Sequence, residues 1–363
     1  MSDPYFSETY AEARRRFIAA ARAAGAQMHA YTLGPAMPDT LTIDVAVLGA
    51  EHAPALVISS GIHGIEGFFG SAVQLALLDL LAKATLPQHI RYVIIHGVNP
   101  FGFEHLRRVN EDNIDLNRNF MMNSGDYAGA PAGYSGLNGF LNPPSRPSRL
   151  EPFRLKALWN IWRSGLQSLK ETVAGGQYEY SRGLFYGGPG PCASTQIVQN
   201  NCDAWLAASQ HIVHIDLHTG LGAFAKPRLL LNESPDAAHF AWYAKTYGAD
   251  CVEPLVQPHG TAYRASGIFG QWMQRHFSTR DYRFVGAEFG TYDVIRVLAA
   301  LRAENRAYHY CAKSDAAYWR AKTELRECFC PASVVWRRDV VESALRIIDR
   351  SARALEGESH ENK

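Results

Sequence analysis

The segment LVISSGIHGIEG, residues 56–67, joins a strand pattern to a glycine-rich turn that carries a histidine and a glutamate. Its first five residues are a short, continuous and mainly apolar run, which is typical of a strand covered on both faces. Apolar residues at helical spacing follow over 69–83. A buried strand that leads through glycines into a helix indicates an α/β sheet, and active sites of such sheets gather at the carboxyl ends of the strands.

The rest of the chain alternates strand and helix patterns in the same way. We predict further strands over 42–49, 92–95, 211–217, 229–231 and 284–289. We predict helices over 7–24, with Ser7 as N-cap, and over 150–173, 195–209, 236–247, 267–276, 294–312, 315–327 and 332–355. Two stretches rich in Gly, Pro, Asn and Ser, 121–149 and 174–192, are predicted to be long loops. With no linker and no internal repeat, the sequence predicts one domain over 1–363.

The composition excludes several classes of protein. The 363 residues include 36 Lys and Arg against 35 Asp and Glu, so a net charge of +1 offers no global attraction for nucleic acid or an anionic membrane. No apolar run reaches the ~18 residues of a transmembrane helix, and we expect no signal peptide. The six cysteines are too dispersed for a disulfide scaffold. We therefore expect a cytoplasmic globular protein with neither nucleic acid nor membrane as a partner.

Two segments far apart in the sequence carry candidate metal ligands. His63 and Glu66 follow the first buried strand at a spacing of three, which lets both turn toward one cation. A catalytic zinc takes three protein ligands and keeps one position open. In HIVHIDLHTG, residues 211–220, His218 stands at the carboxyl end of a strand and is the predicted third ligand, whereas we interpret His214 and His211 as core residues. Taken alone, the first pair also fits a loop histidine beside a glutamate at a helix start.

Two further segments carry polar groups suited to substrate chemistry. In NEDNIDLNRNF, residues 110–120, Asn117 and Arg118 offer an amide and a planar guanidinium that can hold a carboxylate, although a polar turn is the plain alternative. Glu288 is the one acidic residue in the apolar strand FVGAEFGT, residues 284–291. Since a buried carboxylate is costly unless it is paired, Glu288 belongs either to a structural ion pair or to a base near a metal.

Taken together, the motifs resemble the zinc metallocarboxypeptidase family, the funnelins, near a bacterial branch and with a relation to the aspartoacylase and succinylglutamate desuccinylase deacylases. The motifs are HGIE (63–66), DLNRNF (115–120), HIDLHTG (214–220), YRASG (263–267) and EFGT (288–291), in this order. The resemblance implies a three-layer α/β/α sandwich around a mixed, mostly parallel sheet of about eight strands. Its core would cover about 40–295, with a helix at 7–24 before it and helices over 294–355 after it.

The resemblance also implies the metal and the catalytic base. One Zn²⁺ per chain would be held by His63, Glu66 and His218, and Asp115 would orient His63 as the carboxylate behind it. Glu288 would act as the general base toward a metal-activated water.

The substrate contacts follow from the same resemblance. Asn117 and Arg118 would hold the terminal carboxylate of the substrate, and Tyr263 would close on it. Arg107 would polarise the scissile carbonyl, with Arg108 as the close alternative because the spacing before DLNR varies in the family.

These roles predict a zinc-dependent hydrolase that removes a C-terminal amino acid from a peptide or peptide-like substrate. Deacylases share the same metal core, so a zinc amidohydrolase acting on N-acyl amino acids is the alternative. The predicted partner is in either case a small molecule with a free carboxylate. A non-catalytic carboxylate-binding module is disfavoured because the metal set and Glu288 are intact. The predicted loops 121–149 and 174–192 would rim the active site and restrict it to small substrates.

Overall fold

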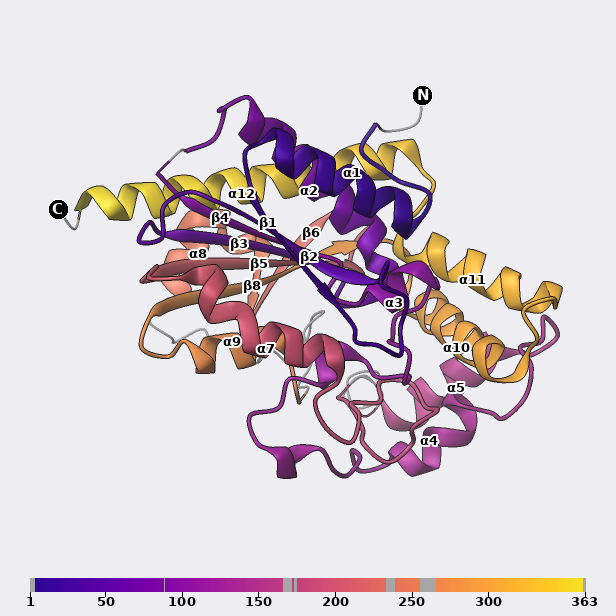
Figure 1. Ribbon diagram of the computed structural model, residues 1–363. Coiled ribbons are helices and arrows are strands. Elements are labelled where there is room, and N and C mark those ends of the chain that lie inside the picture. Colours follow the sequence, from indigo (N-terminus) through magenta and orange to yellow (C-terminus); the bar gives the residue numbers. More distant parts are fainter. Residues whose placement is uncertain are drawn as a thin grey trace.

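The computed structural model contains a mixed sheet with helices on both faces (Figure 1). It describes residues 4–87, 89–165, 172, 175–232, 239–254 and 266–361. Within these residues the sheet has eight strands in the order β1-β2-β4-β3-β5-β8-β6-β7. Their bounds are β1 Gln27–Thr32, β2 Thr42–Leu48, β3 Ala55–Ser60, β4 Arg91–His96, β5 His211–Gly220, β6 Pro227–Leu231, β7 Val252–Pro254 and β8 Asp281–Gly290.

The centre of the sheet consists of four parallel strands, β4, β3, β5 and β8. All six side chains of β3 are buried, as its apolar run predicts. The register between neighbouring strands sets Ser59 opposite Asp216 and His218 opposite Glu288. Because these strands run in the same direction, their carboxyl ends meet at one edge of the sheet, and the candidate residues come with them.

One face of the sheet is covered by α1 (Tyr10–Ala23), α2 (Gly67–Ala82), α8 (Phe240–Tyr247) and the long α12 (Val334–Glu361), which lies alongside α2 (Figure 1). The helical stretch Gly64–Ala82 is long and apolar enough to cross a membrane by length and composition alone. Yet 83% of its most apolar window is buried inside the protein, because α2 is apolar on all sides and is packed between the sheet, α1 and α12. It is thus a core helix.

The opposite face is covered by α7 (Ala193–Leu206) and α9 (Phe269–His276), which pack Trp205 and Phe269 into a second apolar core. The remaining helices of the described residues gather toward one end of the molecule in Figure 1. They are α3 (Pro100–Glu104), α4 (Tyr134–Leu141), α5 (Phe153–Ser164), α10 (Val294–Tyr310) and α11 (Ala316–Phe329). Short 3₁₀ turns lie at η1 (Gly64–Glu66), η2 (Leu116–Arg118), η3 (Ser124–Asp126) and η4 (Ala249–Cys251).

This architecture confirms the predicted α/β fold with a mixed, mostly parallel sheet and flanking helices. Some local predictions were wrong. Helix α4 lies within 121–149, which the composition had assigned to a loop. The N-cap of α1 is Thr9 rather than Ser7, because the Thr9 hydroxyl accepts a hydrogen bond from the backbone N–H of Glu12. Strands β1 and β7 had not been predicted at all.

Candidate metal centre

Two strand ends bring the three candidate metal ligands together. After β3 the chain enters η1, which presents His63 and Glu66, while His218 lies near the end of neighbouring β5. Gly64 allows this turn to approach α3 closely, because a Cβ atom at position 64 would lie 2.1 Å from the carbonyl carbon of Gly102. A glycine in the HGIE motif is therefore what lets η1 pack against α3.

The ligand atoms converge on the carboxylate of Glu66. Its Oε1 lies 2.9 Å from Nδ1 of His63, and its Oε2 lies 3.0 Å from Nδ1 of His218. One ligand atom from each residue lies within 4.8 Å of the other two, and all three side chains are buried. Two imidazole nitrogens and one carboxylate are a donor set that zinc takes in catalytic sites, where water holds the fourth position. The three residues fit such an ion.

A second carboxylate stands behind each imidazole. Nε2 of His63 lies 3.3 Å from Oδ1 of Asp115, and Nε2 of His218 lies 2.7 Å from Oδ2 of Asp216. A carboxylate in this place accepts the Nε2–H proton and leaves Nδ1 with its lone pair for a metal. The structure thus places Asp115 behind His63, where the resemblance had put it. Asp216 was not among the predicted site residues, although its i, i+2 spacing from His218 puts both on one face of the strand and is the signal that could have found it.

The close packing of carboxylates and imidazoles shifts the pKa values of Glu66 and His218. Burial opposes the charge of Glu66, but the imidazoles of His63 and His218 lower its pKa to about 2. Burial also opposes the charge of His218, but Asp216 and Glu66 raise its pKa well above the usual range. In the absence of a metal these two carboxylates favour the protonated form of His218, and a cation would compete with the proton on Nδ1.

Glu288 lies one strand away from these ligands. It stands opposite His218 on β8, is 9% exposed, and its Oε1 accepts a hydrogen bond of 2.8 Å from the backbone N–H of Leu221. Burial, followed by the charge of Glu66, raises the pKa of Glu288 to about 7. A carboxyl group with this pKa can exchange a proton near neutral pH, which is what a general base requires.

The two neighbouring arginines point to different places, and the assignment of Arg107 is corrected. Arg107 is fully buried, with Nε 3.0 Å from Oε1 of Glu304 on α10 and its guanidinium carbon 3.5 Å from the ring centroid of Tyr308. Arg108 instead lies at the cluster. Its Nε donates to Oδ2 of Asp115 over 2.9 Å, and its Nη2 lies 2.6 Å from Nε2 of His63. The structure therefore brings Arg108, and not Arg107, to the candidate metal centre.

The residues predicted to hold the substrate carboxylate, here called the carboxylate grip, are Asn117, Arg118 and Tyr263, and the first two lie beside the cluster. Arg118 is 1% exposed and belongs to η2, directly after Asp115. Burial opposes the charge of Asp115, but Arg108, followed by His63 and Arg118, holds its pKa well below the usual range. The Oδ1 atom of Asn117 accepts a hydrogen bond from the backbone N–H of Phe269, which ties η2 to the start of α9. Tyr263, the third predicted residue of the grip, lies outside the described residues.

Part of the predicted loop 174–192 packs directly on this segment. The hydroxyl of Tyr178 donates to the carbonyl of Arg118 over 2.7 Å, and the backbone N–H of Asp115 donates to the carbonyl of Tyr186. Gly176 has a φ of +95°, and a Cβ at this position would lie 2.7 Å from Cδ of Arg118. A side chain at position 176 would thus both strain the backbone and displace the arginine. The loop therefore helps to define where the Arg118 guanidinium sits.

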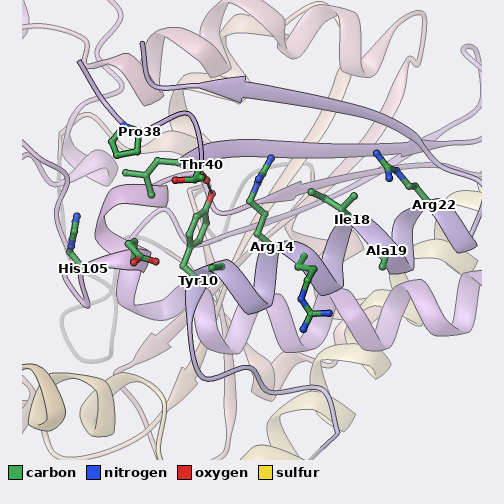
Figure 2. Close-up of a pocket in the computed structure, with 12 residues that line it drawn as sticks. Tyr10, Arg14, Ile18, Ala19, Arg22, Pro38, Thr40 and His105 are labelled. Carbon is green, nitrogen blue, oxygen red and sulfur yellow. Dashed lines mark hydrogen bonds between the residues drawn. The ribbon is translucent and has the colours of Figure 1, made fainter. Parts of the chain in front are cut away.

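Two other features lie away from this centre. A groove of about 650 Å³ runs along α1. Figure 2 shows Tyr10 pointing toward Thr40 in this groove, and it also shows the side chains of Arg14 and Arg22 on the same helix. The residues that line it include none of the candidate site residues. Cys202, Asp203 and His276 form another group of ligand atoms within 4.8 Å between α7 and α9, but Asp203 and His276 are exposed.

Comparison with known proteins places the fold. No curated protein matches the chain in sequence. Carboxypeptidase A from Helicoverpa armigera is 12% identical with a TM-score of 0.50, and the match covers 89% of this chain and 73% of that chain. Bovine thrombin-activatable fibrinolysis inhibitor, solved with tick carboxypeptidase inhibitor, is 12% identical with a TM-score of 0.48 and coverages of 94% and 98%. Succinylglutamate desuccinylase from Chromobacterium violaceum is 12% identical, with a TM-score of 0.39 and coverages of 86% and 75%.

The match to carboxypeptidase A confirms the resemblance in fold that the motifs had suggested. At the level of sequence, a family model described as "Protein of unknown function (DUF2817)" matches residues 6–343, which is nearly the whole chain. The protein therefore belongs to the DUF2817 family.

Proposed function

We propose that this protein is a zinc-dependent hydrolase of the carboxypeptidase type, which removes a C-terminal amino acid from a small peptide or peptide-like substrate. One observation carries the proposal: Glu66 lies between the Nδ1 atoms of His63 and His218, with Glu288 directly opposite His218 on the next strand. His63, Glu66 and His218 would hold a Zn²⁺ ion, which would lower the pKa of a bound water toward ~7 and polarise the substrate carbonyl.

The protein's own residues account for the proton transfers. The backbone N–H of Leu221 holds Oε1 of Glu288, so the other oxygen, Oε2, is the atom that takes the proton from the attacking water. The same carboxyl group then delivers this proton to the nitrogen of the leaving amino acid. A pKa of about 7 suits both steps, because the group must be ionised in the first and protonated in the second.

Two arginines complete the proposed mechanism. Arg108, beside His63, stabilises the negative charge that develops on the carbonyl oxygen. Arg118 holds the terminal carboxylate of the substrate, and a buried guanidinium is suited to this because it binds both carboxylate oxygens in one plane. Recognition of a free carboxylate at a fixed distance from the reacting carbonyl restricts cleavage to the last residue of a chain.

The test combines metal analysis with a substrate screen. The purified protein is expected to hold about one zinc per chain, and to hydrolyse peptides with a free C-terminus faster than the same peptides with an amidated C-terminus. Glu288→Gln, which keeps the size of the side chain and its bond to Leu221, should bind zinc but lose hydrolysis.

A parallel screen with N-acyl amino acids separates two reactions at the same centre. Turnover of N-acyl amino acids without peptide cleavage would reassign the protein as a deacylase. A zinc-loaded protein that hydrolyses neither class would refute the proposed function.

A further inference from the structure

A row of hydrogen bonds leads from a tyrosine on β8 to the metal ligand on β5. The Tyr282 hydroxyl lies 2.8 Å from Nδ1 of His214, and Nε2 of His214 lies 2.7 Å from the Ser59 hydroxyl on β3. Ser59 in turn contacts Oδ1 of Asp216 over 2.6 Å, and Oδ2 of Asp216 contacts Nε2 of His218 over 2.7 Å. Five side chains from three neighbouring strands thus form one continuous connection.

The chemistry of the groups determines which atom donates at every step. The carboxylate of Asp216 can only accept, so the single hydroxyl proton of Ser59 points to Oδ1. The Ser59 oxygen then accepts a hydrogen bond from Nε2–H of His214. A neutral imidazole has one N–H, so Nδ1 of His214 accepts a hydrogen bond from the hydroxyl of Tyr282.

The surroundings keep this arrangement in one protonation state. Ser59, His214 and Asp216 are fully buried, and the rings of Phe269 and Phe284 stand edge-on against His214. Burial lowers the pKa of His214 to about 4, so its imidazole is neutral near pH 7. Burial also raises the pKa of Tyr282 well above its usual range, so its hydroxyl stays a donor. In such dry surroundings an unmade hydrogen bond is costly, which keeps the row intact.

We propose that Tyr282, His214 and Ser59 are positioning residues of the metal centre. They fix Asp216 in the orientation that accepts Nε2–H of His218, and they thereby hold His218 as the tautomer whose Nδ1 lone pair faces the metal. Loss of the tyrosine hydroxyl lets His214 change tautomer, and the serine loses its donor. The inference rests on the proposed metal centre, but it concerns zinc affinity and needs no turnover.

The test measures the zinc dissociation constant of the whole protein by competition with a chromophoric chelator. The variants are Ser59→Ala and Tyr282→Phe. Tyr247→Phe is the matched control, because Tyr247 is also buried and also loses one hydrogen bond, to Ser351 between α8 and α12. We expect zinc affinity to fall about 10-fold in Ser59→Ala and about 3- to 10-fold in Tyr282→Phe, while Tyr247→Phe stays within about 2-fold of the unchanged protein.

A spectroscopic signature separates positioning from a loss of stability. In ¹⁵N NMR spectra of the histidine rings, the unchanged protein and Tyr247→Phe should show His214 with its proton on Nε2, whereas Tyr282→Phe should show a shifted or mixed tautomer. Equal zinc affinity in all variants, or His214 protonated on Nδ1 in the unchanged protein, would overturn the inference and leave the proposed function standing. Failure of the unchanged protein to bind zinc would overturn both.

Discussion

Replacing Glu288 by glutamine should make the metal-free protein more stable at alkaline pH and should lower kcat of the zinc-loaded protein. Burial, followed by the charge of Glu66, raises the pKa of Glu288 from its ordinary value of 4.5 to about 7 in the folded protein. A carboxyl group with a raised pKa stabilises the fold fully below pH 4.5, and this contribution is lost as the pH rises through 7, where the buried group ionises. At 1.36 kcal/mol for each pH unit, the ionised form costs about 3 kcal/mol. Glutamine does not ionise and avoids this cost.

The assay is urea unfolding of both metal-free proteins at pH 5 and at pH 8. Titrating groups outside the cluster are common to the two proteins, so their contributions cancel in the difference, whereas Glu66 and the two histidines respond to the charge of Glu288. We expect the free energy of unfolding of Glu288→Gln, relative to the unchanged protein, to rise by about 2–3 kcal/mol between the two pH values. The zinc-loaded variant should lose about 10²- to 10⁴-fold in kcat, the usual contribution of a general base. A stability difference that does not change between pH 5 and pH 8 would contradict the raised pKa of Glu288.

Other substitutions test the remaining parts of the site. His218→Ala should reduce zinc, measured by elemental analysis, from about one per chain to a small fraction, because two ligands hold the ion poorly. Arg108→Met should lower kcat by about 10²-fold or more in a peptidase assay, whereas Arg107→Met should leave kcat within a few-fold. Arg118→Ala should lower kcat/KM on free-acid peptides by about 30- to 1000-fold yet hardly change it on amidated ones; equal losses on both would contradict a grip on the carboxylate. Glu304→Gln should cost about 3–5 kcal/mol in urea unfolding, because it leaves the buried guanidinium of Arg107 without its carboxylate.

The strands that the sequence predicts and those that it does not differ in how deeply their side chains are buried. β3 was predicted because every side chain in it is buried, so that apolar residues follow one another. β1, QMHAYT, lies at the edge of the sheet with side chains that are only partly buried or exposed, so its composition carries no strong pattern. β7 has three residues and is too short to show a period. The centre of the sheet was therefore predictable, and its edges were not.

The candidate site shows a similar division. His63, Glu66 and His218 were predictable because strand ends and short spacings are visible along the chain. Which of the two adjacent arginines lies at the metal centre was not predictable, because Arg107 is held away from it by Glu304, which is 197 residues distant along the chain. Leu106, just before the two arginines, has a φ of +50°, and no residue type in the segment predicts this left-handed backbone conformation. Such choices are made by tertiary contacts.

The contact between Arg108 and His63 has a thermodynamic consequence. Arg108 donates to Nε2 of His63, while Asp115 stands ready to accept a proton from the same atom. An imidazole bound to a metal through Nδ1 carries its proton on Nε2, so it can serve Asp115 but not Arg108. Uptake of the ion and loss of the bond between Nη2 of Arg108 and His63 are therefore one linked event, while Nε of Arg108 keeps its bond to Asp115. By reciprocity, any ligand that engages the released Nη2 raises the affinity for the ion by the factor with which the ion raises the affinity for that ligand. Zinc and substrate should bind this protein cooperatively.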